Sequence, residues 1–133
     1  MKKRISSIIF ILSLVFLSCT TDVKDCLCST EFREYNITII DTSGTPVDSL
    51  LTRITNSRGK EFTPHGSYYQ QSLEGKYWIM DDSYKNEFTV RPTSIFFEGA
   101  KEGVTVEAAF LFNTDECKCH VNKVAGLDTI VAQ

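Results

Sequence analysis

Two matched pairs of cysteines, Cys26 with Cys28 and Cys117 with Cys119, constrain the fold of this 133-residue chain more than any other feature. With Cys19 set aside for the reason given below, the remaining four cysteines are an even number, which in an exported protein points to disulfide bonds. A bond within either pair would close a very small, strained ring, so we expect the two pairs to join each other. Such bonds close loops of roughly 90 residues, and the first is worth about 4–5 kcal/mol in the chain-entropy model.

The order of the pairing depends on how the two cysteine segments run. Residues i and i+2 of an extended strand point to one face, so each pair can present two sulfurs to the other. Antiparallel neighbours would give Cys26–Cys119 and Cys28–Cys117. The alternative is a metal site built from the four cysteines, or from three of them with His120. Zinc sites favour two to four residues between paired cysteines, whereas here there is one.

An export signal occupies the first eighteen residues. Three positive residues at 2–4 precede a run at 5–17 that is apolar except for three serines. Thirteen residues are too few for a membrane-spanning helix, which needs about 20, but they suit the apolar region of a secretory signal peptide. The chain is therefore expected to reach an oxidising compartment, where disulfides form.

A cysteine stands where this signal ends. Ser18 followed by Cys19 resembles the lipobox of bacterial lipoproteins, with Phe16 at the position where leucine is usual. The resemblance implies cleavage between Ser18 and Cys19, and acyl chains on Cys19 that anchor the protein to a membrane of the cell envelope. More than one acyl chain makes such anchoring stable. Thr20 after the cysteine, in place of Asp, implies the outer membrane by analogy with lipoprotein sorting.

Charge limits the class of partner once residues 1–18 are removed. Eleven Lys and Arg then face seventeen Asp and Glu, a formal net charge of −6. Such an acidic body suits neither nucleic acid nor a polybasic membrane-binding surface. Its length suits one domain. We therefore divide the chain into signal peptide 1–18, lipidated N-terminus and tether 19–33, and β-sandwich domain 34–133.

Apolar residues of the body recur with the period of strands. Tyr35, Ile37 and Ile39 alternate with polar residues, and the same alternation over 104–113 places five apolar side chains on one face. Turn residues recur about every 8–12 residues, which favours an all-β fold, a single Ig-like or transthyretin-like antiparallel β-sandwich of about seven to nine strands. The expected strands are 35–39, 50–56, 68–73, 76–81 (central in its sheet), 87–91, 94–98, 104–113, 117–124 and 128–131.

Glycine and proline recur at two steps of this pattern. Residues 41–47 read D-x-x-G-x-P-V, and residues 75–79 read G-x-Y-x-apolar. Both steps resemble the carboxypeptidase regulatory-like domains, which are similar in fold to transthyretin. The resemblance covers about residues 34–112 and leaves out the segment 117–120. The transthyretin-like hydrolases end in Tyr-Arg-Gly-Ser, which this chain lacks, so their activity is not implied.

Few side chains suggest chemistry. His65 lies in a turn, and His120 is expected to point away from the cysteine face, either exposed or in a structural hydrogen bond. Asp81 and Asp82 predict a solvated loop, because the spacing of an EF-hand calcium site is missing. No Ser-His-Asp arrangement can be read from the sequence. A candidate glycan or peptide patch, if exposed, comprises Tyr68, Tyr69, Tyr77, Trp78 and Tyr84.

These observations favour a lipid-anchored, non-enzymatic binding or assembly module with a protein partner in the envelope. We assign no catalytic residue and no cofactor. One alternative is a small metal- or thiol-dependent protein that uses Cys117, Cys119 and His120. Another is a glycan- or solute-binding lipoprotein. Ser49 and Thr129 stand in Asp-Ser/Thr-apolar triplets that resemble acceptors of periplasmic O-glycosylation.

Overall fold

Alternating apolar and polar residues form strands throughout the part of the chain that the computed structural model describes, residues 25–65 and 74–133. These residues contain one short 3-10 helix, η3, at Asp82–Glu87, and no helix long and apolar enough to cross a membrane. The strands are β1 (Glu34–Ile40), β2 (Leu51–Asn56), β3 (Glu61–Phe62), β4 (Lys76–Asp81), β5 (Thr93–Lys101), β6 (Val104–Thr114), β7 (Val121–Ala125) and β8 (Thr129–Val131).

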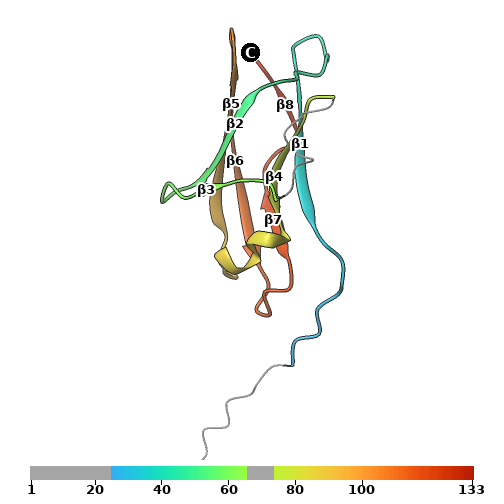
Figure 1. The fold of residues 1–133 in the computed structure, drawn as a ribbon, viewed down its shortest axis with the longest axis vertical. Helices are drawn as coiled ribbons and strands as arrows, with labels where there is room; N and C mark the ends of the chain where they lie inside the picture. Colours follow the sequence, from blue (N-terminus) through green and yellow to red (C-terminus); the bar gives the residue numbers. More distant parts are fainter. Residues whose placement is uncertain (1–24, 66–73) are drawn as a thin grey trace, which may run out of the picture.

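The strands form two sheets that face each other as a β-sandwich (Figure 1). The smaller sheet has the order β4-β1-β8, and the larger has the order β3-β2-β5-β6-β7. The predicted all-β sandwich is confirmed. One strand pair departs from the predicted antiparallel arrangement, because β8 lies beside β1 and runs in the same direction.

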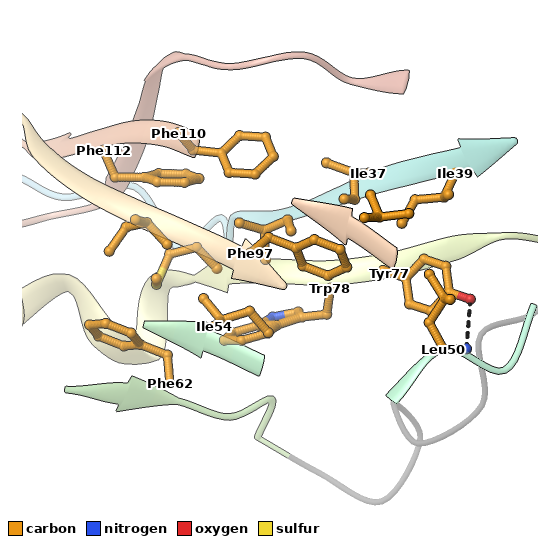
Figure 2. Packing of buried hydrophobic residues seen from close by; sticks show 14 of the residues in the cluster. Ile37, Ile39, Leu50, Ile54, Phe62, Tyr77, Trp78, Phe97, Phe110 and Phe112 are labelled. Carbon is orange, nitrogen blue, oxygen red and sulfur yellow. Dashed lines mark hydrogen bonds between the residues drawn. The ribbon is translucent and has the colours of Figure 1, made fainter. Parts of the chain in front are cut away.

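The core between the sheets is built from alternate residues of the strands. Ile37 and Ile39 of β1 and Phe110 and Phe112 of β6 are buried, which confirms the predicted alternation in both strands. Figure 2 shows Trp78 of β4 among the same packed side chains. Burial of a large apolar side chain contributes about 1.5–3 kcal/mol, so this cluster supplies the main driving force for folding.

Strand β4 is an edge strand, whereas its apolar content predicted a central one. It pairs only with β1, yet five of its six residues are buried. Tyr77 lies 6.1 Å from Phe97 of the larger sheet, and Trp78 lies 6.1 Å from Tyr84 of η3, measured between ring centroids. Because successive residues of a strand point to opposite faces, both faces of β4 are covered.

Two other predicted strands differ, and a third is not tested. Residues 87–91 form no strand, since Phe88 ends η3 and Thr89 bonds locally to Arg91. The strand predicted from 117 begins only at Val121. Residues 68–73 lie outside the described residues. The two-residue strand β3 was missed, because it is too short to show an alternating pattern.

The turn at 41–47 and the step at 75–79 are neighbours in the sandwich. The Asp41 carboxylate accepts hydrogen bonds from the N–H groups of Ser43 and Thr45, at 2.8 and 2.9 Å. The Ile39 N–H donates to the carbonyl of Gly75 at 2.8 Å. Gly75 has a φ of 69°, and a Cβ there would stand 2.5 Å from the Ile39 carbonyl oxygen. Only glycine fits so close a backbone contact.

The hydroxyl of Tyr77 bonds the loop between β1 and β2 to the core. It donates to the Val47 carbonyl at 2.6 Å and accepts from the Leu50 N–H at 3.1 Å, and both bonds are buried. Figure 2 shows the second bond as a dashed line. Tyr84 makes the same two kinds of bond to the backbone of Thr63, at 2.7 and 3.1 Å, but at the surface.

Removal of the Tyr77 hydroxyl should destabilise the protein more than removal of the Tyr84 hydroxyl. Tyr77→Phe leaves a buried carbonyl and N–H without partners, and we expect a loss of about 1–3 kcal/mol. Tyr84→Phe lets water replace the hydroxyl, and we expect a loss below about 1 kcal/mol. Urea unfolding of the disulfide-intact variants measures both losses, and equal losses would contradict the buried setting of Tyr77.

Candidate functional site

Two disulfides fasten the N-terminal segment to the turn between β6 and β7. Cys26 is bonded to Cys117 and Cys28 to Cys119, with Cα–Cα distances of 5.6 and 5.3 Å. Figure 1 shows the N-terminal segment leaving the sandwich at the end where β6 turns into β7. We call this region, residues 25–33 with residues 113–122 and η3, the cross-linked end. The prediction that the two cysteine pairs join each other is confirmed.

The antiparallel order Cys26–Cys119 with Cys28–Cys117 is wrong, because residues 115–119 form a turn. The carbonyl of Asp115 accepts the Lys118 N–H at 3.0 Å, and its carboxylate accepts the Cys119 N–H at 3.2 Å. Lys118 has a left-handed φ of 53°. The two cysteine segments therefore do not meet as antiparallel strands, and the first cysteine of one pair bonds the first of the other.

A chain of hydrogen bonds crosses the cross-linked end. Nδ1 of His120 lies 2.7 Å from Oδ2 of Asp82, and Nε2 of His120 lies 2.9 Å from Oγ of Ser29. His120 and Asp82 are only 6% and 7% exposed, whereas Ser29 is exposed. An ionised carboxylate only accepts hydrogen bonds, so Nδ1 carries a proton, and when the imidazole is neutral its Nε2 accepts the Ser29 hydroxyl. The predicted structural hydrogen bond of His120 is confirmed, and its alternative, solvent exposure, is wrong.

Asp82 also accepts two backbone hydrogen bonds. Its Oδ2 accepts the N–H of Arg33 at 2.9 Å, and its Oδ1 accepts the N–H of Val121 at 2.7 Å. Burial raises the pKa of Asp82, but the hydrogen bonds from His120, Arg33 and Val121 together outweigh it and leave the pKa below its ordinary value. The ionised carboxylate therefore fixes the start of β1, the start of β7 and the imidazole relative to one another.

An open hollow of about 700 Å³ lies at the cross-linked end. Its lining combines the serine and histidine of the hydrogen-bonded chain with the exposed side chains of Leu27 and Val90 and with acidic residues. Hydrogen bonding from the Cys119 N–H is the main cause that holds the pKa of Asp115 below its ordinary value. The lining residues are Leu27, Cys28, Ser29, Val90, Asn113, Thr114, Asp115, Glu116, Cys117, Cys119, His120 and Asn122.

The candidate modification residues lie elsewhere in the described structure. Ser49 and Thr129 are exposed, in the loop before β2 and at the start of β8. His65 is exposed and lies 4.9 Å from the Tyr84 ring between ring centroids. The predicted cleavage and lipidation positions, Ser18 and Cys19, lie outside the described residues.

Two residues of the predicted aromatic patch, Tyr77 and Trp78, are buried and cannot contact a ligand at the surface. Tyr68 and Tyr69 lie outside the described residues. The Trp78 indole N–H donates to Asp81 at 3.1 Å, and the other oxygen of Asp81 accepts the Ser83 N–H at 2.8 Å and caps η3. The predicted solvated loop is therefore wrong, since both acidic residues, 81 and 82, are buried and hydrogen-bonded.

The cysteines that the alternative metal site would use are bonded to one another. All four sulfurs form disulfides, so none is a thiolate ligand here. Among residues 25–65 and 74–133, no three His, Cys, Asp or Glu side chains are grouped so that they could hold a metal ion.

Hydrogen bonds link Ser29 to His120 and His120 to Asp82. The same order of contacts links the nucleophile, the base and the orienting carboxylate of acyl-transfer enzymes. Sequence reasoning missed this arrangement because Ser29 is 91 residues from His120, and His120 is 38 residues from Asp82. One signal was present: Ser29 follows Cys28 and His120 follows Cys119. With the correct cysteine pairing, the disulfide brings the serine and the histidine together.

Peptide mapping of the oxidised protein should give the pairing described above. Leu27 separates the cysteines of the first pair and Lys118 those of the second. Cleavage after both residues places the four cysteines on four peptides. We expect linked peptides that join Cys26 to Cys117 and Cys28 to Cys119. Linked peptides that join Cys26 to Cys119, or four free thiols, would contradict the structure.

Replacement of Asp82 should destabilise the protein at neutral pH and less so in acid. Asp82→Asn removes the charged acceptor of three donors, at an expected cost of about 3 kcal/mol at pH 7. Because the folded-state pKa of Asp82 is lowered, its stabilisation is complete above its ordinary value of 3.8 and is lost as the pH falls through the folded pKa.

The measurement is urea unfolding of the wild type and the Asp82→Asn variant at several pH values. The difference in unfolding free energy should narrow below about pH 4. Asp41 and Asp115, whose pKa values are also lowered, are present in both proteins, so the difference reports on Asp82. A difference that is constant down to about pH 2 would show that the carboxylate charge is not responsible.

Comparison with known proteins adds no family to this geometry. No protein-family model matches the chain, and a search of curated proteins finds no match. The lipoprotein and carboxypeptidase regulatory-like resemblances therefore stay predictions.

Proposed function

We propose that the chain is a lipid-anchored protein of the cell envelope whose β-sandwich serves as a binding or assembly module through its cross-linked end. The observation that carries the proposal is the pair of disulfides from residues 26 and 28 to residues 117 and 119. They fasten to the body the segment that directly follows the predicted anchor, so a pull on Cys19 reaches the body through covalent bonds.

The distance from the anchor supports a role close to the membrane. Seven residue steps separate Cys19 from Cys26, and they span at most about 25 Å when fully extended. The cross-linked end would then stay near the membrane surface and meet other molecules held there. The outer membrane is the proposed location, and a protein of the envelope is the proposed partner.

The surface of the cross-linked end supports contact with a partner. Leu27 and Val90 are 98% and 51% exposed and line the same hollow. Apolar side chains exposed beside polar ones are typical of the contacts that proteins make with partners or ligands. Two disulfides hold this surface in one shape, which reduces the entropy lost on binding.

Loss of Cys19 should abolish lipid attachment without unfolding the body. Cys19→Ala should not incorporate the labelled fatty acid that the wild type incorporates. The described body does not include Cys19, so the thermal unfolding temperature of the variant should match that of the wild type. Absence of label from the wild type, or equal labelling of the variant, would overturn the lipid anchor.

Photo-cross-linking in the native envelope tests the contact surface. A photoreactive residue at Val90 should give a discrete adduct with an envelope protein. The control is Leu51, which is 83% exposed and lies at the opposite end of the larger sheet, where β2 pairs with the end of β5. Adducts at position 51 and none at position 90 would place the contact surface elsewhere.

A further inference from the structure

We propose that Ser29, His120 and Asp82 form a nucleophilic site that hydrolyses small neutral or cationic carboxylic esters, with Ser29 as the acyl acceptor. The inference goes beyond the binding role. It rests on the hydrogen-bonded chain at the cross-linked end and does not depend on the lipid anchor or on a protein partner.

The geometry has the two contacts that activate a serine. The Ser29 hydroxyl lies 2.9 Å from Nε2 of His120, within reach for proton transfer. The opposite ring nitrogen is held at 2.7 Å by Asp82, which fixes the tautomer in which Nε2 is the basic atom. Asp82 is itself oriented by the N–H groups of Arg33 and Val121.

The aspartate and the histidine of the site are buried, whereas the serine is open to solvent. Asp82 and His120 are 7% and 6% exposed, so the ion–imidazole contact is shielded from water and from salt. Ser29 is exposed and lines the hollow of about 700 Å³, so a substrate can reach its hydroxyl. A purely structural histidine needs no such opening at its second nitrogen.

The disulfide between Cys28 and Cys119 positions both reacting groups. Ser29 directly follows one of its cysteines and His120 directly follows the other. The nucleophile and the base therefore flank one covalent link, although 91 residues separate them in the chain. The disulfide limits the movement of Ser29 relative to His120 and so keeps the reacting atoms aligned.

The reaction balances with water as the only co-reactant. Nε2 of His120 takes the Ser29 proton while Oγ forms a bond to the ester carbonyl carbon. The bond from that carbon to the alcohol oxygen then breaks, and His120 gives its proton to the departing alkoxide. Water repeats the attack on the acyl-serine, releasing the carboxylic acid and restoring Ser29. Asn122 lines the same hollow; Arg33 bonds its side-chain oxygen, and its amide N–H groups are the candidate donors to the oxyanion.

The lining of the hollow sets the class of ester. Asp115 and Glu116 line the same hollow as Ser29, and their negative charge disfavours anionic substrates. Leu27 and Val90 offer an apolar contact for a short acyl chain. A hollow of this volume accommodates a small molecule. The site therefore suits esters that are small, uncharged or positively charged.

The test uses the full-length, oxidised lipoprotein purified in detergent. A fluorophosphonate probe should form a one-to-one adduct on Ser29, located by peptide mass spectrometry, and p-nitrophenyl butyrate should be hydrolysed with turnover. Ser29→Ala should lose both signals. Thr30→Ala, which removes the neighbouring exposed hydroxyl, is the matched control and should keep them.

The role of the histidine has its own readout. His120→Gln should lower the rate of probe labelling at pH 8 by about 100-fold or more, because the variant lacks the ring nitrogen that takes the serine proton. Because His120 is buried, folding of that variant is checked by its circular dichroism.

Two results would overturn the proposal. One is the absence of any adduct on Ser29 in protein whose disulfides are intact. The other is equal ester hydrolysis by the wild type and Ser29→Ala. Either would assign the hydrogen-bonded chain to structure alone and would leave the cross-linking result at Val90, and with it the binding role, unaffected.

Discussion

The disulfides that join residues 26 and 28 to residues 117 and 119 close nearly the whole body into one loop, and the arrangement of the cross-linked end depends on that closure. In the chain-entropy model the first bond across about 90 residues stabilises the fold by about 4–5 kcal/mol. The second adds little of this kind, because the loop is already closed. Its effect is geometric: two links prevent residues 25–33 from rotating about a single bond and so hold Ser29 near His120 and Arg33 near Asn122.

The carboxylate of Asp82 then connects parts of the chain that no sheet ladder joins. Strand β7 is at the edge of the larger sheet and pairs only with β6. The Val121 N–H donates to Asp82, and the Val121 carbonyl accepts the hydroxyl of Tyr35 from β1 at 3.0 Å. Arg33 donates to the Asn122 side chain at 2.5 Å. Side chains from the smaller sheet and from η3 therefore bond the backbone groups at the start of this edge strand, which would otherwise be available for pairing with another chain.

The sequence predicted what local periodicity determines and missed what distant contacts determine. The alternation in β1 and β6 depends only on residues within each strand, so both were predicted correctly. The position of β4 at a sheet edge depends on strand order, which its own residues do not encode. Ring strain excludes bonds within each cysteine pair, so the sequence predicts that the two pairs join each other. The order of the bonds depends on the turn at Lys118. Its left-handed φ could not be predicted, because lysine rarely adopts that conformation. Asp82 looked solvated because its three donors come from elsewhere in the chain.

One disulfide links stability and chemistry in this molecule. Cys28–Cys119 holds the N-terminal segment on the body, and the same bond sets the approach of Ser29 to His120. A compartment that keeps thiols reduced would leave Ser29 on a segment held near His120 only by hydrogen bonds, with Leu27 free to leave the hollow. The predicted export signal therefore acts on more than location. In the oxidising compartment that the export signal predicts, this bond would form and would hold Ser29 beside His120 and Leu27 at the hollow.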